Sequence, residues 1–402
     1  MSRRPRLAIS LGDPCGIGPE LLLTSLPALL ARAEATVVGC RAGLDLLEDL
    51  PGAPVSWRWI ESPAQAPTGF QGQALRLQVS APAPDDRLLA EVLWLDPTPE
   101  ITRGQLCLGA GSAASGRATV EAIRVAALMT MAGLADALVT LPMAKSAAHL
   151  AGYDIPGHTE YLQHLSDAPM TRMAFVSPRL NVVLHTVHQS LRSVVESLDA
   201  DAVAETLVFS TDQFIRLTGK KDLRVALCAL NPHAGEEGAF GQEERLLEDA
   251  LAQAEAAFLD FTPGPGRPVT GDPGEDQPKP HSPGQRGLEV LIGSGAGEGR
   301  PAPVFFGPLP SDSIFQRASK GEFDLVVALY HDQGLIPVKL LEPTRAVNLT
   351  LGLPFIRTSP DHGTAFDKAG KWIAEAENFM EAAALAVRLA GREGLPVLSP
   401  RG

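Results

Sequence analysis

Three histidines each follow a short apolar, β-branched run that predicts a central strand of a sheet. They are His188, His233 and His331. In an open α/β sheet, ligands bind beyond the carboxyl ends of the strands, so the three imidazoles could converge on one point. Imidazole is a preferred ligand of zinc and similar divalent ions, and three histidines with an open position are typical of a catalytic metal site. Three unrelated histidines at strand ends would give the same pattern.

Two carboxylates and one lysine accompany this pattern. Asp332 is next to His331, and Asp312 follows the stiff Gly-Pro-Leu-Pro segment 307–310. A carboxylate beside a metal ligand can orient that ligand or bind the metal through water. We therefore treat Asp312 as an accessory candidate. Asp332 and Lys145 are the candidates for the group that relays a proton.

A second group of residues could bind an anion. His158 and Thr159 open a predicted helix, whose N-terminus suits a negative charge, although an ordinary helix cap would look the same. Lys339, Asn348 and Arg357 lie on successive elements near the C-terminal end. Arginine can bind a phosphate or carboxylate through two hydrogen bonds, while lysine acts as a point charge. Each of these charges alone is also compatible with a solvated surface position.

The glycine cluster at 12–18 reads Gly-Asp-Pro-Cys-Gly-Ile-Gly. Its spacing does not match the GxGxxG pattern of a dinucleotide-binding loop, and Pro14 would disturb that turn. The cluster predicts a tight connection between a strand and a helix, near the active cleft.

Predicted strands and helices alternate along the chain, which indicates an α/β fold with helices on both faces of the sheet. The predicted strands are 7–11, 36–39, 137–140, 180–186, 223–230, 324–330 and 347–351. The predicted helices begin at Pro19 or cover 112–131, 201–217, 242–259 and 372–389. The Pro-rich segments 56–99 and 262–303 interrupt the pattern, although the first contains short strand-like pieces such as 75–79. The second is expected to be a flexible surface insertion that is dispensable for chemistry.

The composition narrows the class of protein. The chain has 402 residues, enough for two domains. Its net charge of −13 argues against binding to nucleic acid or an anionic membrane, though not against a small anionic substrate. The four cysteines form no CxxC pair, which favours a reducing cytoplasm. No stretch approaches the roughly 20 apolar residues of a membrane span.

Taken in order, the motifs resemble those of the 4-hydroxythreonine-4-phosphate dehydrogenase family, over most of residues 5–395. The matching motifs are 11–20, 157–160, 230–236, 307–312, 330–335 and 348–365. The resemblance implies the fold of isocitrate and isopropylmalate dehydrogenases, with two α/β domains and a cleft between them. We expect 1–138 with 346–402 in the first domain and 139–345, which carries most metal and substrate residues, in the second. It also implies a homodimer whose active site lies at the dimer interface.

The resemblance assigns roles to the candidate residues. It implies one divalent ion (zinc, magnesium or cobalt) held by His188, His233 and His331, one of them from the partner subunit. The positions that match the family's substrate-binding residues are His158, Thr159, Lys339, Asn348 and Arg357. The segment 362–370 resembles an adenosine-binding loop, with candidate residues His362, Gly363, Thr364, Ala365, Asp367 and Gly370. A carboxylate at Asp367 would favour NAD over NADP.

The family's reaction is the oxidation of 4-phosphooxy-L-threonine to 2-amino-3-oxo-4-phosphooxybutyrate, which decarboxylates to 3-amino-1-hydroxyacetone phosphate. The segment 141–145 varies around the family's proline and lysine, so other substrates stay open. These are threonate or erythronate 4-phosphate and a carboxylated cyclohexadiene diol. A metal-dependent hydrolase and an acyl transferase are more distant alternatives, and the 363–370 loop argues against the hydrolase.

Overall fold

The computed structural model describes residues 3–62, 65–259 and 302–395. Nearly all of the predicted insertion 262–303 lies outside the described residues. The chain forms two compact units, of which the first comprises Met1–Met173 with Thr344–Leu395 and the second Ala174–Pro343. We had expected the first boundary at 138, but 139–173 stays with the first unit. The reason is that the helices in this stretch pack on the long helix that precedes it.

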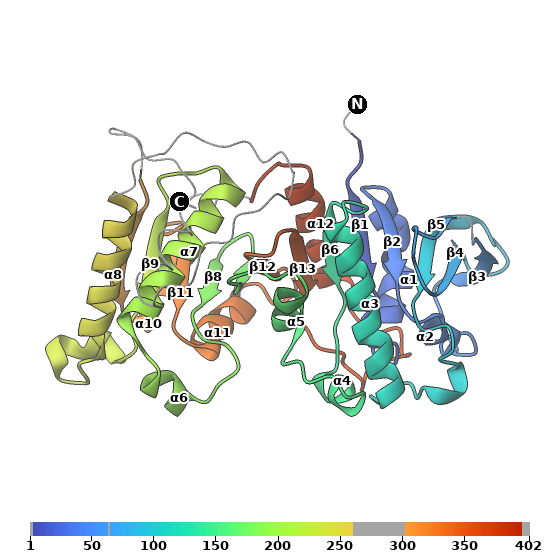
Figure 1. The fold of residues 1–402 in the computed structure, drawn as a ribbon, viewed down its shortest axis with the longest axis horizontal. Helices are drawn as coiled ribbons and strands as arrows, with labels where there is room; N and C mark the ends of the chain where they lie inside the picture. Colours follow the sequence, from blue (N-terminus) through green and yellow to red (C-terminus); the bar gives the residue numbers. More distant parts are fainter. Residues whose placement is uncertain (1–2, 63–64, 260–301, 396–402) are drawn as a thin grey trace, which may run out of the picture. The chain divides into compact units, whose positions relative to one another are not determined.

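The sheet of the first unit has the strand order β12-β13-β6-β1-β2-β5-β4-β3. Its strands are β1 (Arg6–Ser10), β2 (Glu34–Val38), β3 (Ser56–Glu61), β4 (Gln73–Ser80), β5 (Leu88–Asp96), β6 (Ala137–Thr140), β12 (Val347–Leu351) and β13 (Ile356–Pro360). Strands β13, β6, β1, β2 and β5 are parallel, while β12, β4 and β3 run antiparallel to their neighbours. The strand-like piece predicted at 75–79 is confirmed as part of β4, and the segment 56–99 continues the sheet with β3, β4 and β5 (Figure 1).

Helices cover both faces of this sheet. They are α1 (Gly18–Leu30), α2 (Arg41–Asp45), the 3-10 turn η2 (Arg103–Gln105), α3 (Ala113–Met131), α4 (Lys145–Leu150), α5 (His158–Leu165) and α12 (Glu377–Ala390). The predicted cap of α3 is confirmed, since the Ser112 hydroxyl accepts a hydrogen bond from the Ser115 amide. Helix α12 begins at Glu377 rather than at the predicted 372. The residues before Glu377 belong to the loop that follows β13.

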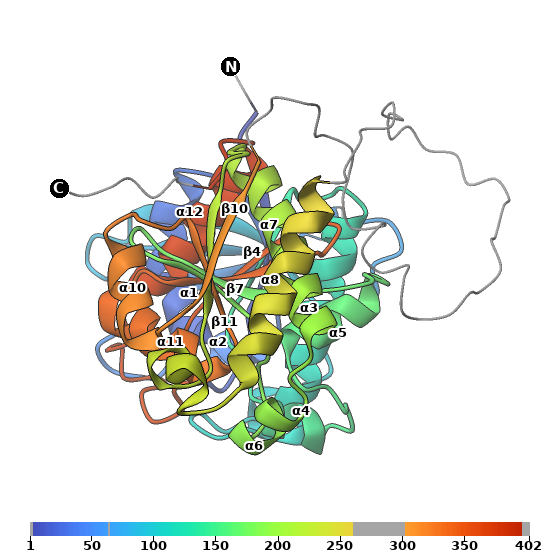
Figure 2. The same ribbon diagram turned by 90° about the vertical axis from the view of Figure 1, so that its left-hand side faces the viewer.

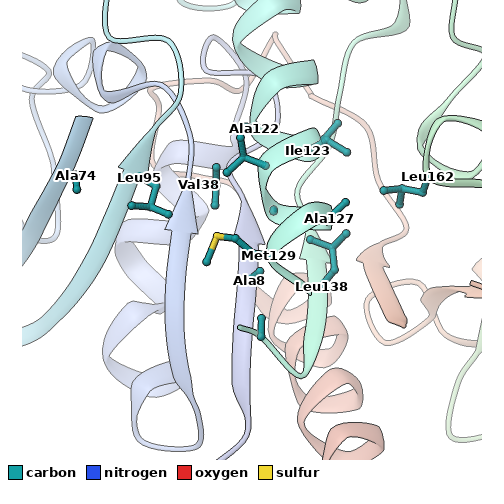
Figure 3. Close-up of a cluster of buried hydrophobic side chains, with 13 residues drawn as sticks. Ala8, Val38, Ala74, Leu95, Ala122, Ile123, Ala127, Met129, Leu138 and Leu162 are labelled. Atoms are coloured by element: carbon teal, nitrogen blue, oxygen red, sulfur yellow. The ribbon is translucent and has the colours of Figure 1, made fainter. Parts of the chain in front are cut away.

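Small aliphatic side chains fill the core between α3 and the sheet (Figure 3). Ala122 and Ile123 of α3 are fully buried, as are Val38 and Leu138 of the strands. With aromatic residues at only 5% of the chain, alanine and branched aliphatic residues provide the close packing. This packing places the carboxyl ends of β1 and β6 side by side.

The glycine cluster forms the predicted tight turn between β1 and α1. Gly12 has a φ of 74°, and a Cβ there would lie 2.3 Å from the carbonyl oxygen of Pro142. Only glycine fits this backbone and this approach. In the next residue, the Asp13 carboxylate accepts hydrogen bonds from the Cys15 amide and from the Ser115 hydroxyl. The turn is thus tied to the N-terminus of α3.

Burial raises the pKa of Asp13 from 3.8 to about 6, which predicts a specific pH dependence. A carboxyl whose pKa is raised by folding stabilises the fold most below its unfolded pKa, and this contribution is lost as the pH rises through 6. We expect Asp13→Asn to gain up to about 3 kcal/mol of unfolding free energy relative to the wild type between pH 4 and 7. Chemical denaturation at several pH values measures it. Parallel pH profiles of the two proteins would contradict it.

The second unit has the strand order β10-β9-β11-β8-β7. Its strands are β7 (Arg172–Val176, which begins at the boundary), β8 (Asn181–Leu184), β9 (Arg224–Cys228), β10 (Val304–Leu309) and β11 (Leu325–Ala328). Its helices are α6 (Leu191–Glu196), α7 (Ala200–Thr218), the turn η3 (Pro232–Gly238), α8 (Glu243–Leu259), α10 (Ser311–Ser319) and α11 (His331–Leu341). Figure 2 shows α7 and α8 on one side of these strands and α10 and α11 on the other.

The α/β fold class expected from the strand–helix alternation is confirmed. Within the described ranges, none of the helices is long and apolar enough to cross a membrane.

Candidate active site

Arg357 of β13 is a buried cation in the first unit, with 2% of its surface exposed. Its Nε and Nη2 donate to the Thr140 hydroxyl at 3.1 and 2.7 Å, and its Nη1 donates to the Thr350 hydroxyl at 3.0 Å. Among the residues that the structure describes, no carboxylate accepts a hydrogen bond from this guanidinium. Burial lowers the pKa of Arg357 to about 9, against the opposing charge of Glu160, so the group stays protonated at neutral pH. A buried cation without a bonded counter-charge suits an anionic ligand.

His158, the first residue of α5, lies near this cation. Its pKa is well below the usual 6.5, first because of burial and then because of the positive charges of Arg357 and Lys145. The imidazole is therefore neutral at pH 7. Within the described part of the chain, no hydrogen-bond partner contacts its buried Nε2. Such an orphaned polar atom calls for a ligand or a water molecule.

Two further buried oxygens share this property. Among the described residues, Asn348 Oδ1 and Ser10 Oγ have no hydrogen-bond partner. Ser10 is in register with Thr140 across β1 and β6, so both side chains point to the same face of the sheet. The buried polar side chains therefore form a cluster that extends from β12 and β13 across β6 to β1.

Three residues of this polar cluster were not predicted from the sequence: Ser10, Thr140 and Thr350. The available signal was weak: Ser10 and Thr140 are polar residues that end their strands after three apolar residues. The carboxyl end of a strand is where ligand-binding residues gather in an open α/β sheet.

The other predicted residues of this unit lie around the start of α5. Thr159 is buried, and Gly157 precedes the helix with an extended backbone. A Cβ on Gly157 would lie 3.1 Å from Glu160 Oε2 and 3.6 Å from Lys145 Cε. Lys145 therefore reaches the same turn as His158, consistent with its proposed role as a proton relay.

The predicted cofactor loop follows β13 and keeps an ordered backbone without regular secondary structure. Ala365 has a φ of 42°, in the left-handed region that non-glycine residues seldom adopt. His362 Nδ1 lies 3.0 Å from the Gly363 carbonyl oxygen. The amide of Ile17 donates to the carbonyl of Thr364 at 3.0 Å. Asp367 is exposed, so its carboxylate is accessible to a ligand.

In the second unit, His188 and His331 lie beside each other, with ring centroids 5.9 Å apart. His331 begins α11, and its Nδ1 lies 2.7 Å from Asp332 Oδ1. A carboxylate on one ring nitrogen fixes the ring and leaves the other nitrogen for a metal. Asp332 is thus placed to orient His331.

His233 lies in a different environment within the same unit. It starts a run of six residues with positive φ, 233–238, in η3, and its ring centroid lies 6.4 Å from that of Phe240. The buried Glu244 holds this turn by accepting hydrogen bonds from the amides of Leu230 and Asn231. In residues 3–62, 65–259 and 302–395, no group of three His, Cys, Asp or Glu side chains is placed to hold a metal ion. Within the described residues, the structure brings His188 and His331 together, but His233 does not join them in a group of three ligands.

The remaining candidates are Lys339 and Asp312. Lys339 is exposed on α11, and Asp312 is exposed in the first turn of α10. Gln333 was not predicted from the sequence. It connects the residues that follow β9 and β11 to the start of α10. Its buried amide donates to the Ala229 carbonyl and to the Ser311 hydroxyl and accepts from the Leu329 amide.

Parallel strands with polar side chains at their carboxyl ends define the protein as an α/β enzyme. The family described as pyridoxal phosphate biosynthetic protein PdxA matches residues 64–270 and 296–386. The chain belongs to this family, which confirms the resemblance inferred from the motifs.

Similar proteins extend over nearly the whole chain. A 4-hydroxythreonine-4-phosphate dehydrogenase from Desulfosudis oleivorans is 36% identical over 391 residues, which is 96% of each chain. A D-threonate 4-phosphate dehydrogenase from Cupriavidus necator is 34% identical, over 96% of this chain and 98% of that protein. The solved structure of a 4-hydroxythreonine-4-phosphate dehydrogenase from Klebsiella pneumoniae is 33% identical with a TM-score of 0.68, covering 97% of this chain and 100% of that one. The predicted dehydrogenase class is thereby confirmed.

Proposed function

We propose that the protein oxidises a small phosphorylated hydroxy acid with NAD, and that 4-phosphooxy-L-threonine is its substrate. The observation that carries the proposal is the buried Arg357 guanidinium, whose hydrogen bonds within the described residues all go to hydroxyl groups. His158 Nε2 and Asn348 Oδ1 are buried beside the same strands without a partner in the described chain. An anionic substrate would supply the missing charge and the missing hydrogen bonds together.

The proposed product is a 3-keto acid that loses carbon dioxide to give 3-amino-1-hydroxyacetone phosphate. Lys145, at the turn that carries His158, is our candidate for moving the proton, with Asp332 as the alternative. Thr159 and Lys339 are proposed to bind the substrate as well. D-threonate 4-phosphate is the second candidate substrate, because the relative from Cupriavidus necator carries that name.

His188 and His331 offer two of the three ligands that we propose for a divalent metal, and the 362–370 loop is our candidate site for the nicotinamide cofactor. A metal ion held by His188 and His331 would supply Lewis acidity, which lowers the pKa of an adjacent hydroxyl group. We propose that His233 completes the ligand set from a second copy of the chain, since only the other two lie together. Asp312 is kept as an accessory group. NAD would supply the hydride acceptor, and the exposed Asp367 suits the diol of its adenosine ribose.

A substrate panel tests the function. The purified protein is incubated with zinc, magnesium or cobalt and NAD or NADP, and formation of the reduced cofactor is followed by absorbance. The substrates are 4-phosphooxy-L-threonine, D-threonate 4-phosphate, D-erythronate 4-phosphate and a carboxylated cyclohexadiene diol. We expect the highest kcat/KM for the first, with NAD. Turnover of an unphosphorylated diol alone would overturn the proposal, and a higher kcat/KM for D-threonate 4-phosphate would select the second candidate.

The cofactor loop gives a separate prediction. Asp367→Ala should raise the KM for NAD by roughly 10-fold or more, since a charge-assisted hydrogen bond contributes about 1.5–3 kcal/mol. The gap between NAD and NADP should narrow, because a carboxylate at this place repels a 2′-phosphate. Lys368→Ala, at the exposed neighbouring position, is the matched control. If Asp367→Ala changed only the KM for the phosphorylated substrate, the assignment of this loop would be wrong.

A further inference from the structure

The loop from 362 to 372 has a backbone that needs outside support. Ala365 and Trp372 have φ values of 42° and 56°, which are unfavourable for residues other than glycine. Asp367 and Lys368 are exposed, whereas Phe366 packs against the buried cluster around Cys15, and Ala369 is buried. Hydrogen bonds at the two ends of the loop add to this packing.

Both ends are held by the first turn of α1. At the near end, the Ile17 amide donates to the Thr364 carbonyl. At the far end, Glu20 Oε2 accepts hydrogen bonds from the Gly370 amide at 2.8 Å and from the Trp372 amide at 3.4 Å. The turn at 12–18 and the start of α1 therefore hold the 362–370 loop, which resembles an adenosine-binding loop.

The Glu20 carboxylate loses its contact with water in order to make these hydrogen bonds. The side chain is 2% exposed, and its Oε1 is buried with no hydrogen-bond partner among the described residues. Burial also raises the pKa of this carboxyl. A buried carboxylate with one oxygen unbonded among the described residues costs folding free energy, so we attribute its role to the backbone that it positions rather than to stability.

We propose that Glu20 is a positioning residue that holds the 362–370 loop in the conformation that binds the adenosine part of the dinucleotide. The proposal rests on the proposed NAD-dependent function. Glu20 acts through the backbone at Gly370 and Trp372, and it does not contact the cofactor itself. Gly16 belongs to the same clamp, because a Cβ there would lie 2.8 Å from the Thr364 carbonyl oxygen.

The test measures binding without turnover. Titration calorimetry gives the Kd for NAD and for ADP-ribose in the wild type, Glu20→Gln, Glu20→Ala and Gly16→Ala. We expect Glu20→Ala to raise both Kd values by about 10-fold or more, and Glu20→Gln by less, because one amide oxygen can still accept a hydrogen bond. The KM for the phosphorylated substrate at saturating NAD should stay within about twofold. Gly16→Ala should weaken NAD binding from the other end of the loop.

A matched control separates positioning from general stability. Asp136→Asn changes a carboxylate that also accepts a backbone amide, that of Arg6, but at the amino ends of β1 and β6. We expect its Kd for NAD to equal that of the wild type even if its thermal stability falls. Equal losses of NAD affinity in Asp136→Asn and Glu20→Ala would overturn the positioning role. If Glu20→Ala does not fold, Glu20→Gln and Gly16→Ala carry the test.

The results distinguish failure of the positioning role of Glu20 from failure of the proposed NAD-dependent function. If the wild type binds neither NAD nor ADP-ribose, the proposed function fails. If the wild type binds NAD and Asp367→Ala weakens that binding, while folded Glu20 variants and Gly16→Ala bind as the wild type does, only the positioning role fails.

Discussion

His331→Ala and His188→Ala proteins are expected to lose bound metal and nearly all turnover. Removal of a group that merely orients a metal ligand costs about 10–100-fold in affinity or activity, so loss of a ligand itself should exceed about 100-fold. His233→Ala should have the same effect if it completes the site from a second copy. Two measurements test this prediction. Elemental analysis after dialysis gives the metal content, and the rate of NAD reduction gives the turnover.

His149→Ala is the matched control, because His149 is an exposed histidine at the end of α4, outside the proposed site. It should keep both metal and turnover. Stoichiometric metal in all three site variants would place the metal centre elsewhere. Metal loss in His188→Ala and His331→Ala, with full retention in His233→Ala, would limit the site to the observed pair.

Arg357→Ala should raise the KM for the phosphorylated substrate by about 10-fold to 150-fold. The estimate follows from roughly 1.5–3 kcal/mol for a charge-assisted contact between arginine and an oxyanion. Arg357→Lys should not restore the wild-type KM, because an ammonium group cannot form the two parallel hydrogen bonds of a guanidinium. Steady-state kinetics with each ligand varied in turn gives the values. A change confined to the KM for NAD would contradict this role.

The stability of the same variants provides an internal check. A buried cation bonded only to hydroxyl groups contributes little to folding, and apolar replacement of buried charges is often neutral or stabilising. Arg357→Met should therefore unfold at or above the wild-type temperature while its substrate affinity falls. A large loss of thermal stability would mean that the guanidinium supports the fold rather than the ligand.

Local sequence signals predicted the elements that local interactions determine. The cap at Ser112 and the strand 137–140 were predicted because a capping hydroxyl and a short apolar run act over a few residues. The position of His158 at the start of a helix was predicted for the same reason. Within 56–99 the strand-like piece at 75–79 was predicted, but β3 and β5 were not, because the prolines and glutamines around them give the segment a loop-like composition.

The environment of Arg357 could not be predicted, because it depends on register between distant strands. Its hydroxyl partner Thr140 is separated from it by 217 residues. The clamp between Glu20 and the loop joins residues 350 positions apart. The boundary of the first compact unit at 173 could not be predicted for a similar reason, since α4 and α5 belong to it through their packing on α3.

The hydroxyl-lined setting of Arg357 has a practical consequence for enzymology. A buried guanidinium that donates to no carboxylate among the described residues attracts any small oxyanion present in excess. Phosphate and sulfate buffers would then act as competitive inhibitors, and kinetic constants obtained in them would describe the buffer as much as the enzyme. Buffers based on bulky organic cations or zwitterions avoid this competition.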